Sequence, residues 1–234
     1  MSAAPLALSL DLDNTLWDTP PVIRRAERVL IEWLGTHAPR ILAKHGETGL
    51  QSLRGAVAAE FPERSHDLSW VRTESLRRAA RLAGYDEDVA PRAFEVFLVA
   101  RNEIRPFDEV PRALTRLAAR LPIYALTNGN ACVHRVGLGA HFAGSVDAAL
   151  AGAAKPDRRI FGALVEMARV PPQSILHIGD DAEADVEGAR AAGCRTVWMN
   201  RNQVSWPGPW APADHEVTDL DGLVRLVDRL LAGA

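Results

Sequence analysis

Short apolar runs that alternate with amphipathic stretches constrain the fold of this chain more strongly than any other feature. In the first run, Leu6, Leu8 and Leu10 alternate with smaller side chains, as is typical of a strand. The strand-like runs are residues 6–10, 121–126, 146–150, 175–178 and 196–199. The helical stretches that lie between or after them are residues 109–120, 157–169, 182–192 and 221–231. This alternation predicts an α/β fold with a Rossmann-like, doubly wound parallel sheet that has helices on both faces.

One long segment, residues 18–101, interrupts this rhythm because it contains no strand-like run. Its helical patterns are residues 21–35, 49–60, 68–84 and 88–101. We therefore expect two domains, a core made of residues 1–17 and 102–234 and an inserted all-helical cap made of residues 18–101. Four aromatic side chains of the insert are expected to form its own core. They are Trp33, Trp70, Phe94 and Phe97.

Polar side chains follow three of the strand-like runs, at the point where each run ends. They are Asp11 and Asp13 after the first run, Thr127 and Asn128 after the second, and Asp180, Asp181 and Asp185 after the fourth. Lys155 precedes Pro156 at the entrance to a predicted helix. The carboxyl ends of parallel strands meet at one edge of a sheet, where α/β proteins bind their ligands. We expect these residues to form one site.

Lysine is rare in this chain. Of the 27 basic residues, 25 are arginines and only Lys44 and Lys155 are lysines. A bias in genomic base composition accounts for the excess of arginine. A lysine that is retained despite this bias can have a chemical reason. A compact ammonium fits some sites that a planar guanidinium does not.

Several carboxylates in one crevice repel each other. Two unit charges about 4 Å apart repel by about 4 kcal/mol at an effective dielectric constant of about 20. A divalent cation and a lysine would relieve this repulsion, and oxygen ligands without Cys or His favour Mg²⁺ over zinc. Such a site suits phosphoryl groups, whose oxygens the cation and the ammonium can neutralise. A carboxylate can then act as the nucleophile and form an aspartyl phosphate, which water hydrolyses.

Four short motifs, in this order along the chain, resemble those of the haloacid dehalogenase-like (HAD) superfamily. They are Asp11-Leu12-Asp13-Asn14-Thr15-Leu16, Thr127-Asn128-Gly129, Lys155-Pro156, and Gly179-Asp180-Asp181 followed four residues later by Asp185. The helical insert lies where the C1-type cap of that superfamily would lie. The resemblance implies a HAD-type phosphatase, a phosphoric monoester hydrolase.

The resemblance also implies a role for each site residue. Asp11 would be the nucleophile, and Asp13 would be the acid for the leaving group and then the base for water. Mg²⁺ would be bound by Asp11, by Asp180 and by the backbone carbonyl of Asp13. Thr127, the Asn128 amide and Lys155 would bind the phosphoryl group. Asp181 and Asp185 would contact the residues that bind the ion and the phosphoryl group, without binding either directly.

A closer resemblance points to bacterial phosphatases that act on flavin mononucleotide or on the phosphorylated pyrimidine precursor of riboflavin. It rests on Trp17-Asp18, on Pro21-Val22-Ile23, on the extension of the second motif to Asn130-Ala131, and on Gly137-Leu138-Gly139 with Phe142. Two positions depart from that pattern. Trp17 stands where a tyrosine is expected, and Asn14 stands where a third aspartate is expected.

Three other functions are alternatives. A phosphomutase could use the same scaffold on a sugar phosphate if its cap excluded water. A non-catalytic binding module is disfavoured because every catalytic position is filled. A haloacid dehalogenase is disfavoured because Asp13 keeps an acid–base position that dehalogenase chemistry does not use.

Composition limits the partners. A net charge of −3 gives no general attraction to nucleic acid or to an anionic membrane. Cys132 and Cys194 make neither a disulfide framework nor a zinc cluster. We expect a cytoplasmic monomer or homodimer whose partner is a small phosphorylated substrate.

Overall fold

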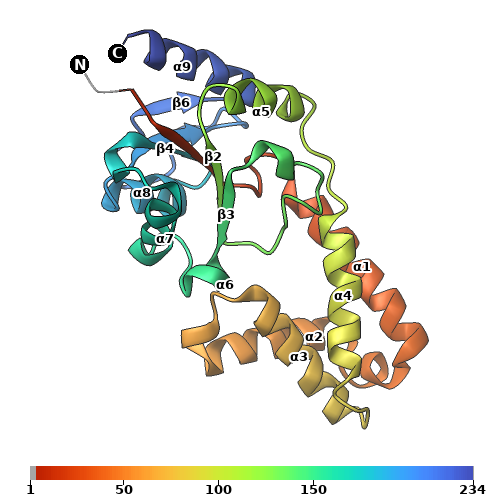
Figure 1. Ribbon diagram of the computed structural model, residues 1–234. Coiled ribbons are helices and arrows are strands. Elements are labelled where there is room, and N and C mark those ends of the chain that lie inside the picture. Colours follow the sequence, from red (N-terminus) through yellow and green to blue (C-terminus); the bar gives the residue numbers. More distant parts are fainter. Residues whose placement is uncertain (1–3, 234) are drawn as a thin grey trace. The chain divides into compact units, whose positions relative to one another are not determined.

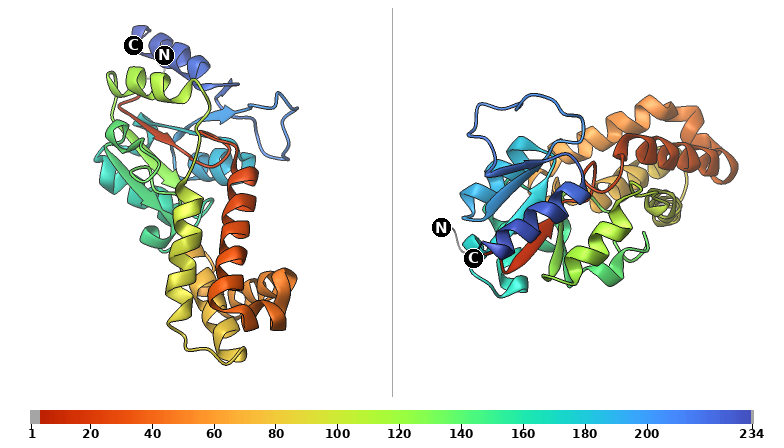
Figure 2. Two further views of the ribbon diagram at one scale, coloured as in Figure 1. Left: turned by 90° about the vertical axis from the view of Figure 1, so that its right-hand side faces the viewer. Right: turned by 90° about the horizontal axis from the view of Figure 1, so that it is seen from above.

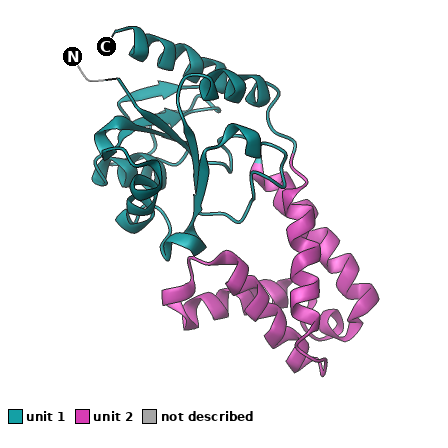
Figure 3. Ribbon diagram, in the orientation of Figure 1, with its two compact units in different colours: residues 1–18, 105–234 teal, residues 19–104 magenta. Residues whose placement is uncertain are grey.

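The computed structural model describes residues 4–233. The chain divides into two compact units, which Figure 3 shows in different colours. Unit 1 comprises residues 1–18 and 105–234, and unit 2 comprises residues 19–104. Unit 1 contains the sheet, and unit 2 is a helical insert between its first two strands.

Unit 1 is built on a parallel sheet with the strand order β3-β2-β1-β4-β5-β6 in the described part of the chain. The strands are β1 (Ala7–Leu10), β2 (Ile123–Thr127), β3 (Gly144–Asp147), β4 (Ile175–Gly179), β5 (Arg195–Met199) and β6 (His215–Val217). The main helices of the unit are α5 (Val110–Ala118), α7 (Arg158–Ala168), α8 (Gly188–Ala191) and α9 (Leu220–Ala232). Helices α5 and α9 lie on one face of the sheet, and α7 and α8 lie on the other (Figures 1 and 2). The predicted α/β fold with an inserted helical cap is confirmed.

The central strand, β1, places its carboxyl end between two neighbours. Leu10 lies beside Ala125 of β2 and beside Ile178 of β4. The ladder continues past the strand, because the Asp11 N–H donates to the Ile178 carbonyl at 2.8 Å. Residues that follow β1, β2 and β4 therefore converge at one edge of the sheet, as the topology of a doubly wound sheet requires.

Burial explains why the sequences of the central strands are predominantly apolar. Every residue of β1, β2 and β4 is buried, which is the pattern of a parallel sheet covered on both faces. On one face, Phe161 and Leu164 of α7 pack against Leu126 and Val146 in a single apolar cluster.

Three sequence predictions for unit 1 differ from the structure. The run 146–150 was expected to be one strand, but β3 ends at Asp147 and a helical turn, α6 (Ala148–Ala151), follows. The Asp147 carboxylate accepts the Leu150 N–H and caps that turn. Strand β6 was not predicted at all. The stretch 182–192 was expected to be one helix, but it consists of a π-helical segment, η4 (Ala182–Glu187), followed by α8.

Unit 2 consists of the helices α1 (Thr19–His37), α2 (Pro39–Glu60), α3 (Leu68–Leu82) and α4 (Val89–Asn102), with a short 3₁₀ turn, η1 (Pro62–Arg64). Helix α2 begins ten residues earlier than the sequence pattern predicted, and it is broken at Gly46, whose φ of 58° suits a glycine. Phe97 lies in the apolar core of the unit, and Trp33 and Phe94 pack against it. Trp70 instead contacts Phe61, with 5.3 Å between the ring centroids.

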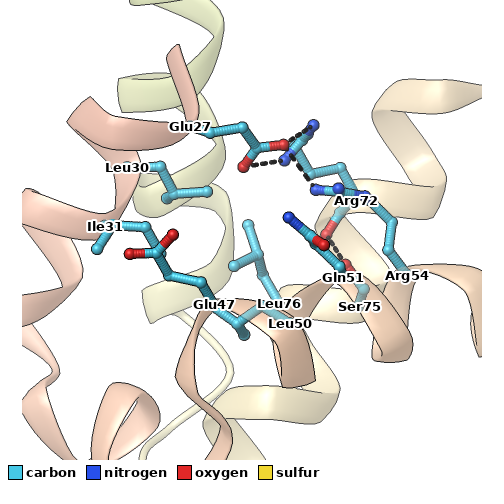
Figure 4. Close-up of a pocket in the computed structure, with 10 residues that line it drawn as sticks. All are labelled: Glu27, Leu30, Ile31, Glu47, Leu50, Gln51, Arg54, Arg72, Ser75 and Leu76. Atoms are coloured by element: carbon cyan, nitrogen blue, oxygen red, sulfur yellow. Dashed lines mark hydrogen bonds and ion pairs between the residues drawn. The ribbon is translucent and has the colours of Figure 1, made fainter. Parts of the chain in front are cut away.

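A cluster of charged side chains lines a cavity of about 30 Å³ inside unit 2 (Figure 4). Glu27 accepts hydrogen bonds at 2.9 Å from both Arg54 and Arg72. Burial would raise the pKa of Glu27, but the two guanidinium groups lower it below its usual value. The Arg72 guanidinium also lies 3.5 Å from the centroid of the Phe97 ring. A space of this size holds about one or two water molecules, so we interpret the cluster as a structural element of unit 2.

Among the described residues, no helix combines the length and the apolar character that crossing a membrane requires.

Candidate active site

Lys155 lies at the centre of the site and is only 5% exposed. Its ammonium donates three hydrogen bonds, to Asp11 Oδ1 at 2.6 Å, to Asp185 Oδ1 at 2.6 Å and to the Leu126 carbonyl at 2.8 Å. Burial alone would lower the pKa of Lys155, but the two carboxylates raise it above its usual value. The lysine is therefore a fixed positive charge whose three protons all have acceptors.

Asp185, on η4, is oriented by three donors. Its Oδ1 accepts from Lys155 and from His177 Nε2, at 3.2 Å, and its Oδ2 accepts the Asp181 N–H at 3.0 Å. Burial would raise the pKa of Asp185, but Lys155 and His177 hold it below its usual range. The side chain is an ionised anchor that holds Lys155 against Asp11.

His177 extends this network into the core. Burial lowers the pKa of His177, so the ring is neutral and donates from Nε2 to Asp185. Its Nδ1 then accepts from the Ser9 hydroxyl at 2.9 Å. The sequence did not predict that His177 links Ser9 to the Lys155–Asp185 pair. The sequence signal for this network was the presence of two polar residues, Ser9 and His177, within runs that are otherwise apolar.

Thr127 and Asn128 follow β2 and shape the loop next to Lys155. The Gly129 N–H donates to Thr127 Oγ1 at 3.0 Å, which leaves the hydroxyl proton of Thr127 to be donated. The side chain of Asn128 makes a reciprocal pair with the backbone of Lys155, accepting its N–H at 2.6 Å and donating to its carbonyl at 3.0 Å. Asn128 thus fixes the segment that carries the lysine.

Three carboxylates form a cluster that could hold a metal ion. Asp11, Asp180 and Asp185 each offer an oxygen, and these oxygens lie within 4.8 Å of one another. Burial raises the pKa of Asp11 well above its usual value, and burial together with Asp185 raises the pKa of Asp180 to about 7. A single ammonium cannot balance three carboxylates, so the cluster favours a cation. Hard oxygen donors of this kind suit Mg²⁺.

The remaining two aspartates of the predicted site are less buried than Asp11 and Asp185. Asp13 is half-buried and follows β1. Asp181 is exposed, and its carboxylate accepts the N–H groups of Glu183 and Ala184 at the start of η4. This is the geometry of a helix N-cap. Asp181 thereby holds η4, which carries Asp185, in place.

Gly179 permits the close approach of Asp185. A Cβ atom at this position would lie 2.1 Å from Asp185 Cγ and 2.2 Å from its Oδ2. We expect Gly179→Ala to displace the carboxylate from Lys155, to lower the free energy of unfolding by about 1–3 kcal/mol and to reduce activity. Denaturant unfolding and steady-state kinetics check this. The control is Gly162→Ala in α7, where a Cβ meets nothing within 4 Å and where alanine is expected to stabilise the helix by about 0.5–1 kcal/mol. Equal stability of the two variants would contradict the requirement for glycine at position 179.

A buried lysine thus contacts two aspartates at the carboxyl edge of a doubly wound sheet, beside a third carboxylate, where α/β proteins bind their ligands. The model of the haloacid dehalogenase-like hydrolase family matches residues 6–193. The chain therefore belongs to the haloacid dehalogenase-like hydrolase family, and the predicted enzyme class, a HAD-type phosphatase, is confirmed.

Similar proteins include both phosphatases and dehalogenases. The 5-amino-6-(5-phospho-D-ribitylamino)uracil phosphatase YigB of Escherichia coli is 34% identical over 197 residues, which cover 82% of each chain. A crystal structure of 2-haloacid dehalogenase from Pseudomonas syringae has 36% identity and a TM-score of 0.88, over 95% of this chain and 98% of that chain. The HAD-hydrolase YfnB of Bacillus subtilis, solved bound to magnesium, has 21% identity and a TM-score of 0.67, over 96% and 99%.

Proposed function

We propose that this protein is a Mg²⁺-dependent phosphatase that hydrolyses a small phosphomonoester through an aspartyl phosphate on Asp11. The observation that carries the proposal is the clamp of Lys155 on Asp11 beside the carboxylates of Asp180 and Asp185. Lys155 fixes one oxygen of Asp11 and supplies the positive charge that a dianionic substrate needs. The clamp therefore orients the nucleophile and attracts the group that it attacks.

The neighbouring side chains complete the reaction. Asp11 attacks phosphorus, and Asp13 protonates the leaving oxygen as the P–O bond breaks. Asp13 then takes a proton from the water that attacks the aspartyl phosphate, which regenerates both carboxyl groups. The Thr127 hydroxyl and the Asn128 backbone N–H donate to the phosphoryl oxygens. Asp185 acts through Lys155, and Asp181 acts through η4.

The residues present fit a magnesium ion. Asp11 and Asp180 would supply carboxylate oxygens, and Asp13 would supply its backbone carbonyl. Asp185 is less suited to direct ligation, because both of its oxygens already accept N–H groups. When bound, Mg²⁺ supplies positive charge to the phosphoryl oxygens and relieves the repulsion among the carboxylates.

Removal of divalent cations is expected to abolish turnover, and Mg²⁺ is expected to restore it. Ca²⁺ should support turnover poorly, because it takes more ligands at longer distances. Mg²⁺ should also raise the melting temperature, because binding to the native state stabilises it. Activity assays and thermal melts in a chelator, with each ion added back, check this. Full activity in the chelator would contradict the metal site.

For the substrate, we propose a phosphorylated riboflavin precursor or flavin mononucleotide. Two observations support this class: the resemblance of the first two motifs to such phosphatases and the 34% identity with the Escherichia coli enzyme. A panel of phosphorylated metabolites that contains both compounds and several sugar phosphates tests it, with phosphate release as the readout. Conversion of a sugar phosphate to its isomer without phosphate release would instead show a phosphomutase.

Dehalogenase activity is the competing chemistry, because a structure of high similarity bears that name. Asp13 and the three-carboxylate cluster disfavour it, since displacement of a halide needs neither a proton donor for the leaving group nor a cation for phosphoryl oxygens. The same panel should include 2-chloropropionate with halide release as the readout. Halide release without phosphatase activity would overturn the proposed function.

A further inference from the structure

Trp17 is buried in the loop that carries the acid–base aspartate. Its side chain is fully buried, and its indole Nε1 donates a hydrogen bond of 2.8 Å to Asp13 Oδ1. The backbones of Asp13 and Trp17 also form an isolated bridge. A buried indole N–H requires an acceptor, and the one that this residue uses is a carboxylate of the proposed reaction.

The loop around this contact is held on several sides. The Leu16 N–H donates to the Leu12 carbonyl at 2.8 Å, and the Phe107 N–H donates to the Leu16 carbonyl at 3.0 Å. Arg201 Nε donates to the Thr15 carbonyl at 2.9 Å. The indole is therefore anchored in a fixed frame and can hold the Asp13 carboxylate in one orientation.

The chemistry of the indole favours one oxygen of Asp13 as the carrier of the proton. An indole nitrogen donates and never accepts, and the carbonyl oxygen of a carboxylic acid is a better acceptor than its hydroxyl oxygen, so the contact favours Oδ1 as the oxygen without a proton. In the protonated acid the hydrogen then resides on Oδ2. Proton transfer to the leaving group requires that this hydrogen face the scissile bond within hydrogen-bond reach. A carboxyl that rotates freely would present the proton in that direction only part of the time.

We propose that Trp17 is a positioning residue that holds Asp13 by Oδ1, so that Oδ2 delivers the proton to the leaving group and later accepts one from water. This inference rests on the proposed function, because it needs Asp13 as the acid and base. Trp17 acts through Asp13 and does not touch the reacting atoms. The tryptophan that stands here in place of the expected tyrosine would therefore contribute to catalysis.

The test is Trp17→Phe, which keeps an aromatic ring and removes the N–H donor. We measure kcat/KM for p-nitrophenyl phosphate, whose leaving group needs no proton, and for the best alkyl phosphate of the substrate panel, whose alkoxide does. For the alkyl phosphate, kcat/KM should fall by about 10- to 100-fold, which is part of what general acid catalysis contributes. For p-nitrophenyl phosphate, kcat/KM should fall by less than about threefold. Both substrates are measured on one preparation, so partial unfolding cancels in the ratio.

Two variants make the outcome decisive. Trp206→Phe removes an indole N–H that donates to the Trp210 carbonyl, and both substrates should be unaffected. Asp13→Asn should show a larger loss that also depends on the leaving group. The inference about Trp17 is wrong if Asp13→Asn shows this dependence and Trp17→Phe does not. Trp17→Phe would then lose the same activity on both substrates, or none on either. If Asp13→Asn shows no dependence, the proposed role of Asp13 fails, and the role of Trp17 fails with it.

Discussion

Replacing Asp11 with asparagine is expected to lower turnover by more than about 1000-fold, because an amide keeps the size of the side chain but cannot attack phosphorus. At about 1.36 kcal/mol per decade, this loss corresponds to more than about 4 kcal/mol of transition-state stabilisation. The fold should persist, since Lys155 keeps its contacts with Asp185 and Leu126. Steady-state kinetics and a thermal melt of the same preparation check both parts.

The matched control for this substitution is Asp219→Asn. Asp219 caps α9 by accepting the Gly222 N–H, and asparagine caps helices about as well as aspartate. This variant should turn over like the wild type. Deamidation of the new asparagine at position 11 would restore aspartate, so the mass of the Asp11→Asn variant must be confirmed after the assay. Turnover within tenfold of the wild type, without deamidation, would contradict the assignment of the nucleophile.

Replacing Lys155 with arginine is expected to lower kcat/KM by about ten- to a thousandfold, or about 1.4–4 kcal/mol. Arginine keeps the charge, so the loss must come from shape: a guanidinium is planar and wider than an ammonium. The three hydrogen bonds of Lys155 converge on one nitrogen within a buried space. A planar fork cannot reproduce that convergence without displacing Asp11 or Asp185.

The chain offers one matched control, because Lys44 is the other lysine in the sequence. Lys44 lies in unit 2 and donates to the Leu82 carbonyl on its surface. Lys44→Arg should leave kcat/KM unchanged. If Lys155→Arg also retained the efficiency of the wild type, charge alone would suffice at the site, and the scarcity of lysine elsewhere would carry no information about it.

The sequence predicted the elements whose burial pattern is strong. Strands β1, β2 and β4 are buried along their whole length, so each appears as a predominantly apolar run. Strand β3 was extended too far because Ala148 and its neighbours suit a helix as well as a strand, and only the cap at Asp147 decides between them. Strand β6 has three residues, of which Val217 alone is buried, and so short a strand leaves no periodic signal.

The sequence also indicated which residues would converge at the site, because strand ends in a doubly wound sheet must meet. It could not show the contacts that orient them. Ser9 and His177 are 168 positions apart, and their hydrogen bond depends on the register of β1 with β4. The bond from Trp17 to Asp13 spans only four residues, yet it depends on the path of one loop. Spacing identifies the chemical groups, whereas tertiary packing determines their hydrogen bonds.

The most direct test of the central claim is to identify the atom that carries the phosphoryl group. In the Asp13→Asn variant, p-nitrophenyl phosphate should still phosphorylate Asp11, because its leaving group needs no acid, while hydrolysis should slow because water lacks its base. Borohydride added after the first turnover would reduce an aspartyl phosphate to homoserine, which mass spectrometry of the peptide that contains Asp11 detects. We predict homoserine at position 11, in proportion to the p-nitrophenolate released. An unmodified Asp11 after release of one equivalent would contradict the account.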